Sequence, residues 1–206
     1  VSRFKLLSKS DQSESGWMMI STAGDSKFSK EPIAHNRGTT VHADELFFNV
    51  PARRKFLKSE RAENRQIETV VKKISLANMS VAFSYAQSGN PKNERGLRKL
   101  ELKAGDPHQR LADVLSPDFV ENSIFLDETR NRYRLFGWIG VPSHNRAQRD
   151  QQFFYVNKRP VKDEVVNQAV RQAYRDLMYG RRHAVYVLFL ELPEEELDVN
   201  VHPTKQ

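Results

Sequence analysis

The stretch that decides the fold reads Gly38-Thr39-Thr40-Val41-His42-Ala43-Asp44-Glu45-Leu46-Phe47-Phe48-Asn49-Val50-Pro51-Ala52-Arg53-Arg54-Lys55-Phe56-Leu57-Lys58. Its opening residues, 39–43, are rich in β-branched side chains and follow a glycine, which predicts a strand. Pro51 suits the first position of a helix, so a short helix is predicted over 52–58. A second helix is predicted over about 61–78, because apolar residues recur there at helical spacing. The chain therefore changes from strand to helix within this stretch.

Short strands and turns precede this stretch, and a second mixed segment follows it. Strands are predicted around Phe4, over 17–20, over 81–85 and over 97–102. Asp106 followed by Pro107 predicts the start of a helix that carries Leu111, Val114 and Leu115. A domain boundary is predicted near residue 105, which divides the chain into 1–105 and 106–206.

The second half mixes strands with a helix in an order that predicts a crossover. Strands are predicted over 119–126, 133–141, 153–156 and 184–192, and a helix over 162–178. The sequence of strand, helix and strand at its end indicates two parallel strands in one sheet. The fold class predicted for the whole chain is α+β.

Composition excludes several classes of protein. The 206 residues hold no Cys, which excludes disulfides, Cys-ligated zinc and a thiol nucleophile. No apolar run approaches the roughly 18 residues of a membrane helix, and no secretory leader is seen. The 33 Lys and Arg exceed the 26 Asp and Glu by seven, and the pI is about 9.6, which favours a polyanionic partner.

Known catalytic motifs are missing. The sequence has no GxxxxGK[ST], GxGxxG, HExxH or GxSxG, and its six His residues lack metal-ligand spacing. Adjacent carboxylates at Glu194, Glu195 and Glu196 indicate a solvated turn rather than an acid–base pair. By contrast, the segment 53–73 carries eight basic residues against three acidic ones, which suits either phosphate binding or an ordinary solvated helix face. Lys55 and Lys58, three apart, are expected on one face of the predicted helix.

Three motifs in the chain resemble the MutL family of DNA mismatch repair proteins. They are the stretch quoted above, Phe154-Tyr155-Val156-Asn157-Lys158-Arg159-Pro160-Val161, and Asp198-Val199-Asn200-Val201-His202-Pro203-Thr204-Lys205. They keep the family's order, and the first is most similar to bacterial members. The resemblance implies the distal part of a GHKL-type ATPase α/β sandwich over 1–105. It implies a ribosomal S5 domain 2-like domain over 106–206, with a left-handed crossover.

The resemblance also implies a nucleotide site. Gly38 and Thr39 match a nucleotide motif near the adenine, and Lys205 matches a lysine that reaches the γ-phosphate. The family's catalytic Glu, Asp-x-Gly-x-Gly and lid motifs are not found in 1–206. We therefore expect an excised piece of a longer protein that uses ATP and Mg²⁺ when intact, and that neither binds ATP nor is active alone.

DNA-binding residues follow from the same resemblance. Lys55 and Lys58 match basic positions of the family's DNA groove, and their neighbours Arg53 and Arg54 are included in the expectation. In the second domain, Glu164 stands where some relatives carry a basic DNA contact, so that site is not carried over. Arg159 and Arg171 are the residues expected to take its place, and Lys162 is a further candidate.

The function implied is that of a matchmaker, an ATP-controlled clamp that binds single- and double-stranded DNA without sequence preference and couples mismatch recognition to strand processing. Its implied partners are a MutS-type mismatch recognition protein, a downstream endonuclease or helicase, and a second copy of the intact protein. A bacterial cytoplasmic, nucleoid-associated location is expected. Two alternatives are an ATPase and transducer fragment of a type II topoisomerase subunit, and a basic RNA-binding protein.

Overall fold

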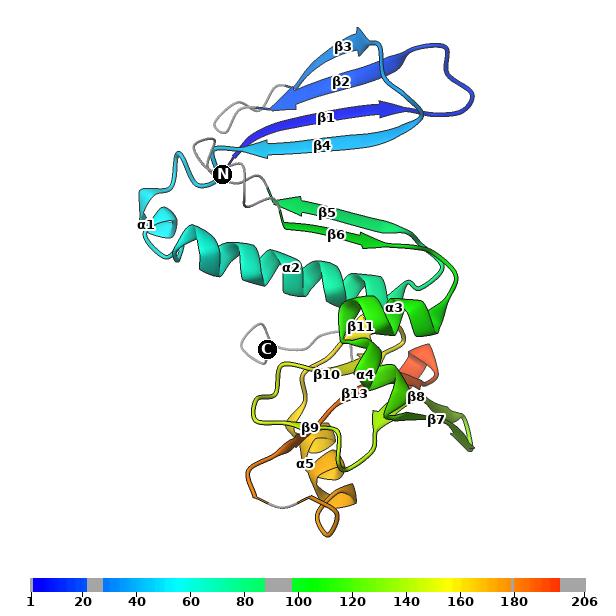
Figure 1. The fold of residues 1–206 in the computed structure, drawn as a ribbon. Helices are drawn as coiled ribbons and strands as arrows, with labels where there is room; N and C mark the ends of the chain where they lie inside the picture. The colour runs from blue at the N-terminus through cyan, green and yellow to red at the C-terminus, as the bar shows by residue number, and fades with distance from the viewer. Residues whose placement is uncertain (1, 22–27, 88–97, 179, 197–206) are drawn as a thin grey trace. The chain divides into compact units, whose positions relative to one another are not determined.

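The computed structural model describes residues 2–21, 28–87, 98–178 and 180–196 (Figure 1). The chain divides into two compact units, Val1–Glu63 and Asn64–Gln206. The domain boundary predicted near residue 105, from the break in pattern before Pro107, does not coincide with this division and stays a prediction. No helix in the described part of the chain is both long and apolar enough to cross a membrane.

The first unit is built on a four-stranded antiparallel sheet in the order β3-β2-β1-β4. In the pair formed by β1 and the edge strand β4, Ser8 lies opposite Thr39, and Lys9 lies opposite Gly38. The strands predicted around Phe4 and over 17–20 and 39–43 are thereby confirmed. The four strands are β1 (Arg3–Lys9), β2 (Gly16–Ser21), β3 (Ser29–Ile33) and β4 (Gly38–Asp44).

Two helices follow β4, and the first is shorter than the sequence predicts. α1 (Pro51–Arg54) begins at Pro51 but ends before the predicted residue 58, with Lys55 as its C-cap. The amides of Phe56 and Leu57 bond to carbonyls only three residues back, and the Lys58 amide donates to the Glu63 carboxylate at 2.8 Å. The prediction that Lys55 and Lys58 share one helical face is therefore wrong, because Lys58 lies in the connection between the two helices.

α2 (Glu60–Ala77) matches the predicted helix to within one residue at each end. Its packing differs from the apolar stripe that predicted it, because Ile67, Val70 and Ile74 remain about half exposed. Ser75 and Leu76 are buried instead. The reason lies in the second unit, where hydrogen bonds to carbonyls near the end of α2 fix the face that turns inward.

Two hairpin strands and two short helices come next. β5 (Phe83–Gln87) pairs with β6 (Arg98–Leu102), and α3 (Pro107–Val114) and α4 (Pro117–Glu121) follow. The predicted cap of α3 is confirmed, since the Asp106 carboxylate accepts from the amides of His108 at 2.9 Å and Gln109 at 3.2 Å. The strand predicted from residue 119 is wrong at its start, because Ser116 caps α4 through the Phe119 amide.

A five-stranded sheet in the order β11-β10-β13-β8-β7 forms the rest of the second unit. β10 and β13 are parallel neighbours with α5 between them in sequence, so the predicted crossover is confirmed. A separate two-stranded ladder pairs β9 with β12. The elements are β7 (Ser123–Arg130), β8 (Tyr133–Gly140), β9 (Asn145–Arg146), β10 (Gln152–Val156), β11 (Arg159–Pro160), α5 (Glu164–Ala173), β12 (His183–Ala184), β13 (Tyr186–Glu191) and the 3₁₀ turn η2 (Glu194–Glu196).

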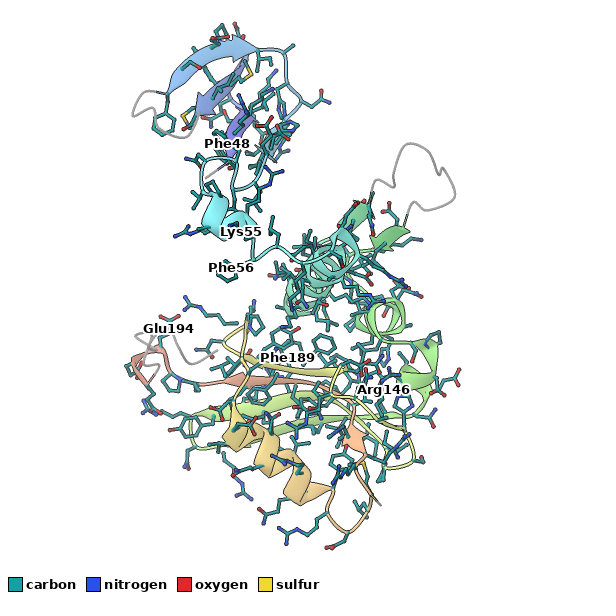
Figure 2. All side chains as sticks on the ribbon, turned by 90° about the vertical axis from the view of Figure 1, so that its left-hand side faces the viewer. Phe48, Lys55, Phe56, Arg146, Phe189 and Glu194 are labelled. Carbon is teal, nitrogen blue, oxygen red and sulfur yellow. The ribbon has the colours of Figure 1, made fainter. Side chains whose placement is uncertain are left out.

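β13 is buried on both faces and connects two apolar clusters. Val187 and Phe189 belong to one cluster with Leu111, Phe119 and other residues, and Tyr186 and Leu188 pack with Tyr174 in the other. Phe189 is labelled in Figure 2. Successive side chains of a strand point to opposite faces of the sheet, so a strand that is buried on both faces contributes to both clusters. α5 ends at Ala173 rather than at the predicted residue 178, and Leu177 beyond it is 58% exposed. The buried Tyr174 hydroxyl donates to the Gly140 carbonyl at 2.6 Å, which anchors the chain where the helix ends.

Candidate functional sites

The start of β4 forms one wall of a hollow of about 1000 Å³ in the first unit. Gly38 has φ +121°, a conformation that L side chains rarely adopt, and a Cβ there would meet no atom within 4 Å. Glycine is therefore required at this position by the backbone conformation, and not by a lack of room for a side chain. The Thr39 hydroxyl lies 2.9 Å from the Ser8 hydroxyl across the strand pair. Both residues predicted for the nucleotide motif thus line the same hollow.

His35 is a second polar group of this hollow, and the sequence analysis did not single it out. Its Nε2 lies 2.8 Å from the Thr40 hydroxyl, and its Nδ1 lies 2.5 Å from the Asn36 carbonyl. Gly16 makes room for it, since a Cβ on Gly16 would come within 2.8 Å of the His35 Cβ. A glycine within a strand often marks such a close approach, but the strand was predicted over 17–20 and Gly16 lies just before it, so this signal was missed.

The rest of the predicted nucleotide site is less complete in the described part of the chain. Lys205 lies outside the described residues. No three His, Asp or Glu side chains come together as metal ligands among those that are described. The hydroxyl and imidazole groups around Thr39 suit hydrogen bonds to a base or ribose, whereas Mg²⁺ is usually bound by carboxylate and phosphate oxygens together with water.

Every residue of the basic segment after β4 is exposed from Pro51 to Glu60. Lys55 and Phe56 follow α1 directly, and the Phe56 side chain is 84% exposed (Figure 2). None of the ion pairs between described residues uses the cations of the first part of this segment. These unpaired cations are Arg53, Arg54, Lys55, Lys58, Arg61 and Arg65.

The later cations of the same segment behave differently. Lys72 pairs with Glu68 at 3.0 Å. Partial burial, together with the nearby Lys162 ammonium, lowers the pKa of Lys73. Lys72 and Lys73 therefore interact with other residues of the second unit. The cations of this segment that form no ion pair with a described residue lie within 53–65.

Arg159 and Arg171, the two candidates of the second half, both lie in the second unit but are held differently. Arg159 opens β11 after a tight turn at Asn157 and Lys158, which both have positive φ. The Asn157 side chain fixes this turn by bonding the carbonyl and the amide of Leu192 at 2.8 and 3.0 Å. Arg171 lies on α5 with its guanidinium 3.5 Å from the Glu164 carboxylate. Glu164 thus partly neutralises the residue expected to compensate for it.

The acidic run and the turn before β8 interact, as expected of a solvated surface. Arg132 pairs with Glu195 at 3.1 Å and with Glu196, and the Tyr133 hydroxyl donates to Glu196. All three carboxylates are exposed. This arrangement confirms the predicted turn and leaves no pair of carboxylates facing a cavity there.

Comparison with known proteins decides the family. A family model described as the C-terminal domain of DNA mismatch repair protein matches residues 111–206. The DNA mismatch repair protein MutL of Cellvibrio japonicus is 43% identical over the whole chain, which covers 32% of that relative. The corresponding protein of Chromohalobacter salexigens is 40% identical, with the same coverage. The chain belongs to the MutL family. It spans about a third of the length of the MutL relatives it matches.

Solved MutL structures support the predicted fold class. The ATPase domain of Aquifex aeolicus MutL complexed with ADP matches with a TM-score of 0.71 at 28% identity, over 94% of this chain and 68% of that one. The N-terminal domain of a DNA repair protein matches with a TM-score of 0.80 at 22% identity, over 95% of this chain and 61% of the other, and so bears on the fold alone. The MutL chain therefore has the predicted GHKL-type and S5-like architecture.

Proposed function

We propose that this MutL-family chain is the DNA-contacting part of a DNA mismatch repair protein, and that it binds the phosphate backbone without reading base sequence. The observation that carries the proposal is the run of exposed, unpaired cations Arg53, Arg54, Lys55, Lys58, Arg61 and Arg65. Cations without protein counter-ions displace condensed ions from DNA phosphates, and such contacts carry no sequence information. Arg159 adds a further cation on the second unit.

The nucleotide belongs to the intact protein in this proposal. Gly38 and Thr39 form a wall beside the base, and Lys205 supplies a charge to the γ-phosphate, which ties the DNA-bound state to ATP and Mg²⁺. The ADP complex of Aquifex aeolicus MutL supports nucleotide binding by analogy. A homodimer, a MutS-type partner, a downstream endonuclease or helicase, and a location at the bacterial nucleoid complete the proposed matchmaker.

Lys58→Glu in the intact protein tests the proposal. We expect weaker binding to duplex and single-stranded DNA alike, and a salt slope lowered by roughly one unit because one fewer counter-ion is displaced. ATP hydrolysis without DNA should remain normal, because Lys58 does not line the hollow at Gly38 and Thr39. Fluorescence anisotropy over a salt titration measures the slope.

Arg130→Glu is the matched control, since Arg130 is an exposed cation near the end of β7 in the second unit and changes the net charge by the same amount. Equal losses of DNA affinity in the two variants would show that only the net charge of the protein matters, and not the position of Lys58. Parental binding by Lys58→Glu across the titration would show that the segment is only a solvated surface.

A further inference from the structure

Phe56 has the most exposed side chain among the large apolar residues that the structure describes. It is 84% exposed, whereas Val165, the next, is 72% exposed. A single exposed apolar side chain is common on protein surfaces and by itself indicates no partner. Two features set Phe56 apart, namely the hydrogen-bonded turn that carries it and the cations on both sides of it. Neither the resemblance to MutL nor the proposed phosphate contacts assign Phe56 a role.

The turn after α1 fixes the backbone on which the Phe56 ring is carried. The Phe56 amide donates to the Arg53 carbonyl at 3.0 Å, and the next amide, of Leu57, donates to the Arg54 carbonyl at 3.2 Å. Figure 2 shows the Phe56 side chain close to Lys55, beside the end of α1. The ring is therefore presented to solvent from a hydrogen-bonded backbone, so little backbone freedom is left to lose when a ligand binds it.

Exposed cations flank Phe56 on both sides along the chain. Lys55 precedes it directly and Lys58 follows two residues later, and both are exposed. Neither ammonium group takes part in the ion pairs formed between described residues. Over 53–65 the chain carries six cations against two carboxylates. A molecule that approaches the Phe56 ring therefore meets a positive surface, which favours a negatively charged partner.

A partner that suits both the ring and the cations must combine negative charge with flat apolar faces. Single-stranded DNA has both, because each nucleotide carries one phosphate and one base whose face is open to stacking. In a duplex the base faces are already stacked on one another, so only the phosphates remain accessible. Aromatic side chains within a positively charged groove are the combination by which proteins bind single strands, and the stacking tolerates any base.

We propose that the Phe56 ring stacks on a base of single-stranded DNA while Lys55 and Lys58 contact the phosphates beside that base. This inference rests on the proposed DNA-binding function and deepens it, because it adds a preference for single strands to contacts that do not distinguish the two forms of DNA. The cations act on both forms, whereas the ring acts on the single strand alone. The stacking also leaves sequence unread, since every base offers a flat face.

Phe56→Leu in the intact protein tests the proposal, because leucine keeps an apolar side chain but removes the flat ring. We expect about a tenfold loss of affinity for a single-stranded oligothymidylate and no loss for a duplex of equal length. The salt slope should stay parental, since no counter-ion contact is removed. Phe56→Tyr keeps the ring and should keep the affinity. Phe28→Leu is the matched control, since Phe28 is another exposed phenylalanine of the first unit, and unfolding temperatures check each fold.

A second readout reports on the stacking itself. Phe56→Trp should show indole fluorescence that the oligothymidylate quenches and the duplex does not, after subtraction of the signal of the parental protein. Parental single-strand affinity in Phe56→Leu overturns the proposal, and so does an equal loss on the duplex or in Phe28→Leu. If Lys58→Glu weakens DNA binding and Phe56→Leu does not, the stacking contact fails while the proposed function stands. If neither variant weakens it, both fail.

Discussion

At the residue scale, Arg110 holds the second unit together. Its side chain is 1% exposed and donates to the carbonyls of Ser75 at 2.6 Å, Val81 at 2.7 Å and Lys103 at 2.6 Å. It also lies over the Phe83 ring, 5.5 Å from the centroid. Burial lowers the pKa of the guanidinium, but an Arg this basic stays charged. One guanidinium therefore joins the end of α2, the connection after it and the residue that follows β6.

Arg110→Met should destabilise the fold, because three carbonyls lose their hydrogen-bond donors at once. Each carbonyl left without a donor costs about 1–3 kcal/mol, and the variant no longer buries a charge, which offsets part of this cost. We expect the free energy of unfolding to fall by roughly 3 kcal/mol. Urea denaturation measures it. The exposed Arg130→Met should change stability by less than about 0.5 kcal/mol. A similar midpoint for both variants would contradict the role given to Arg110.

At the element scale, capping decides where helices begin and tertiary contacts decide where they end. α3 begins at Pro107 because Asp106 accepts two amides, and α4 begins after Ser116 in the same manner. α5 ends where Tyr174 turns inward to bond Gly140. The start of α3 could be predicted because its cap is local, with partners two and three residues away. The cap at Ser116 was missed, since a strand was predicted from residue 119, and the end of α5 depends on Gly140, 34 residues away.

Asp106→Ala should cost about 1 kcal/mol of stability, because the amides of His108 and Gln109 lose their acceptor. Asp106→Asn keeps an acceptor oxygen and should lose far less. Chemical denaturation of both variants gives the difference. Equal losses would mean that the charge of Asp106, rather than its cap, stabilises α3.

At the scale of the whole molecule, the chain divides into a small sheet with little buried surface and a larger unit with two apolar clusters. In the described part of the first unit, Gly16 is the one buried residue. The core of the second unit extends from Leu76 to Phe189. We expect the second unit to resist unfolding longest, because apolar burial supplies most of the stability of a domain.

Residues 1–206 alone should sediment as a monomer. The resemblance to MutL places the contacts of the homodimer mainly in other parts of the intact protein. Sedimentation velocity over a hundredfold range of concentration checks this prediction. A dimer that persists at every concentration would reveal an interface formed by this part of the chain itself.

The sequence by itself determined the family motifs, the strands with clear alternation, and helices such as α2 and α3, which have a long periodic pattern or a cap followed by Pro. Asp106 with Pro107 and the periodicity over 61–78 act through neighbours within a few residues, which is why they could be read directly. The tertiary structure alone decided three bonds that join residues 34 to 82 positions apart. Arg110 donates to the Ser75 carbonyl, the Tyr155 hydroxyl to the Lys73 carbonyl, and the Tyr174 hydroxyl to the Gly140 carbonyl. It also decided which face of α2 is buried. Those outcomes depend on which segments pack side by side, and no local pattern in the chain specifies that.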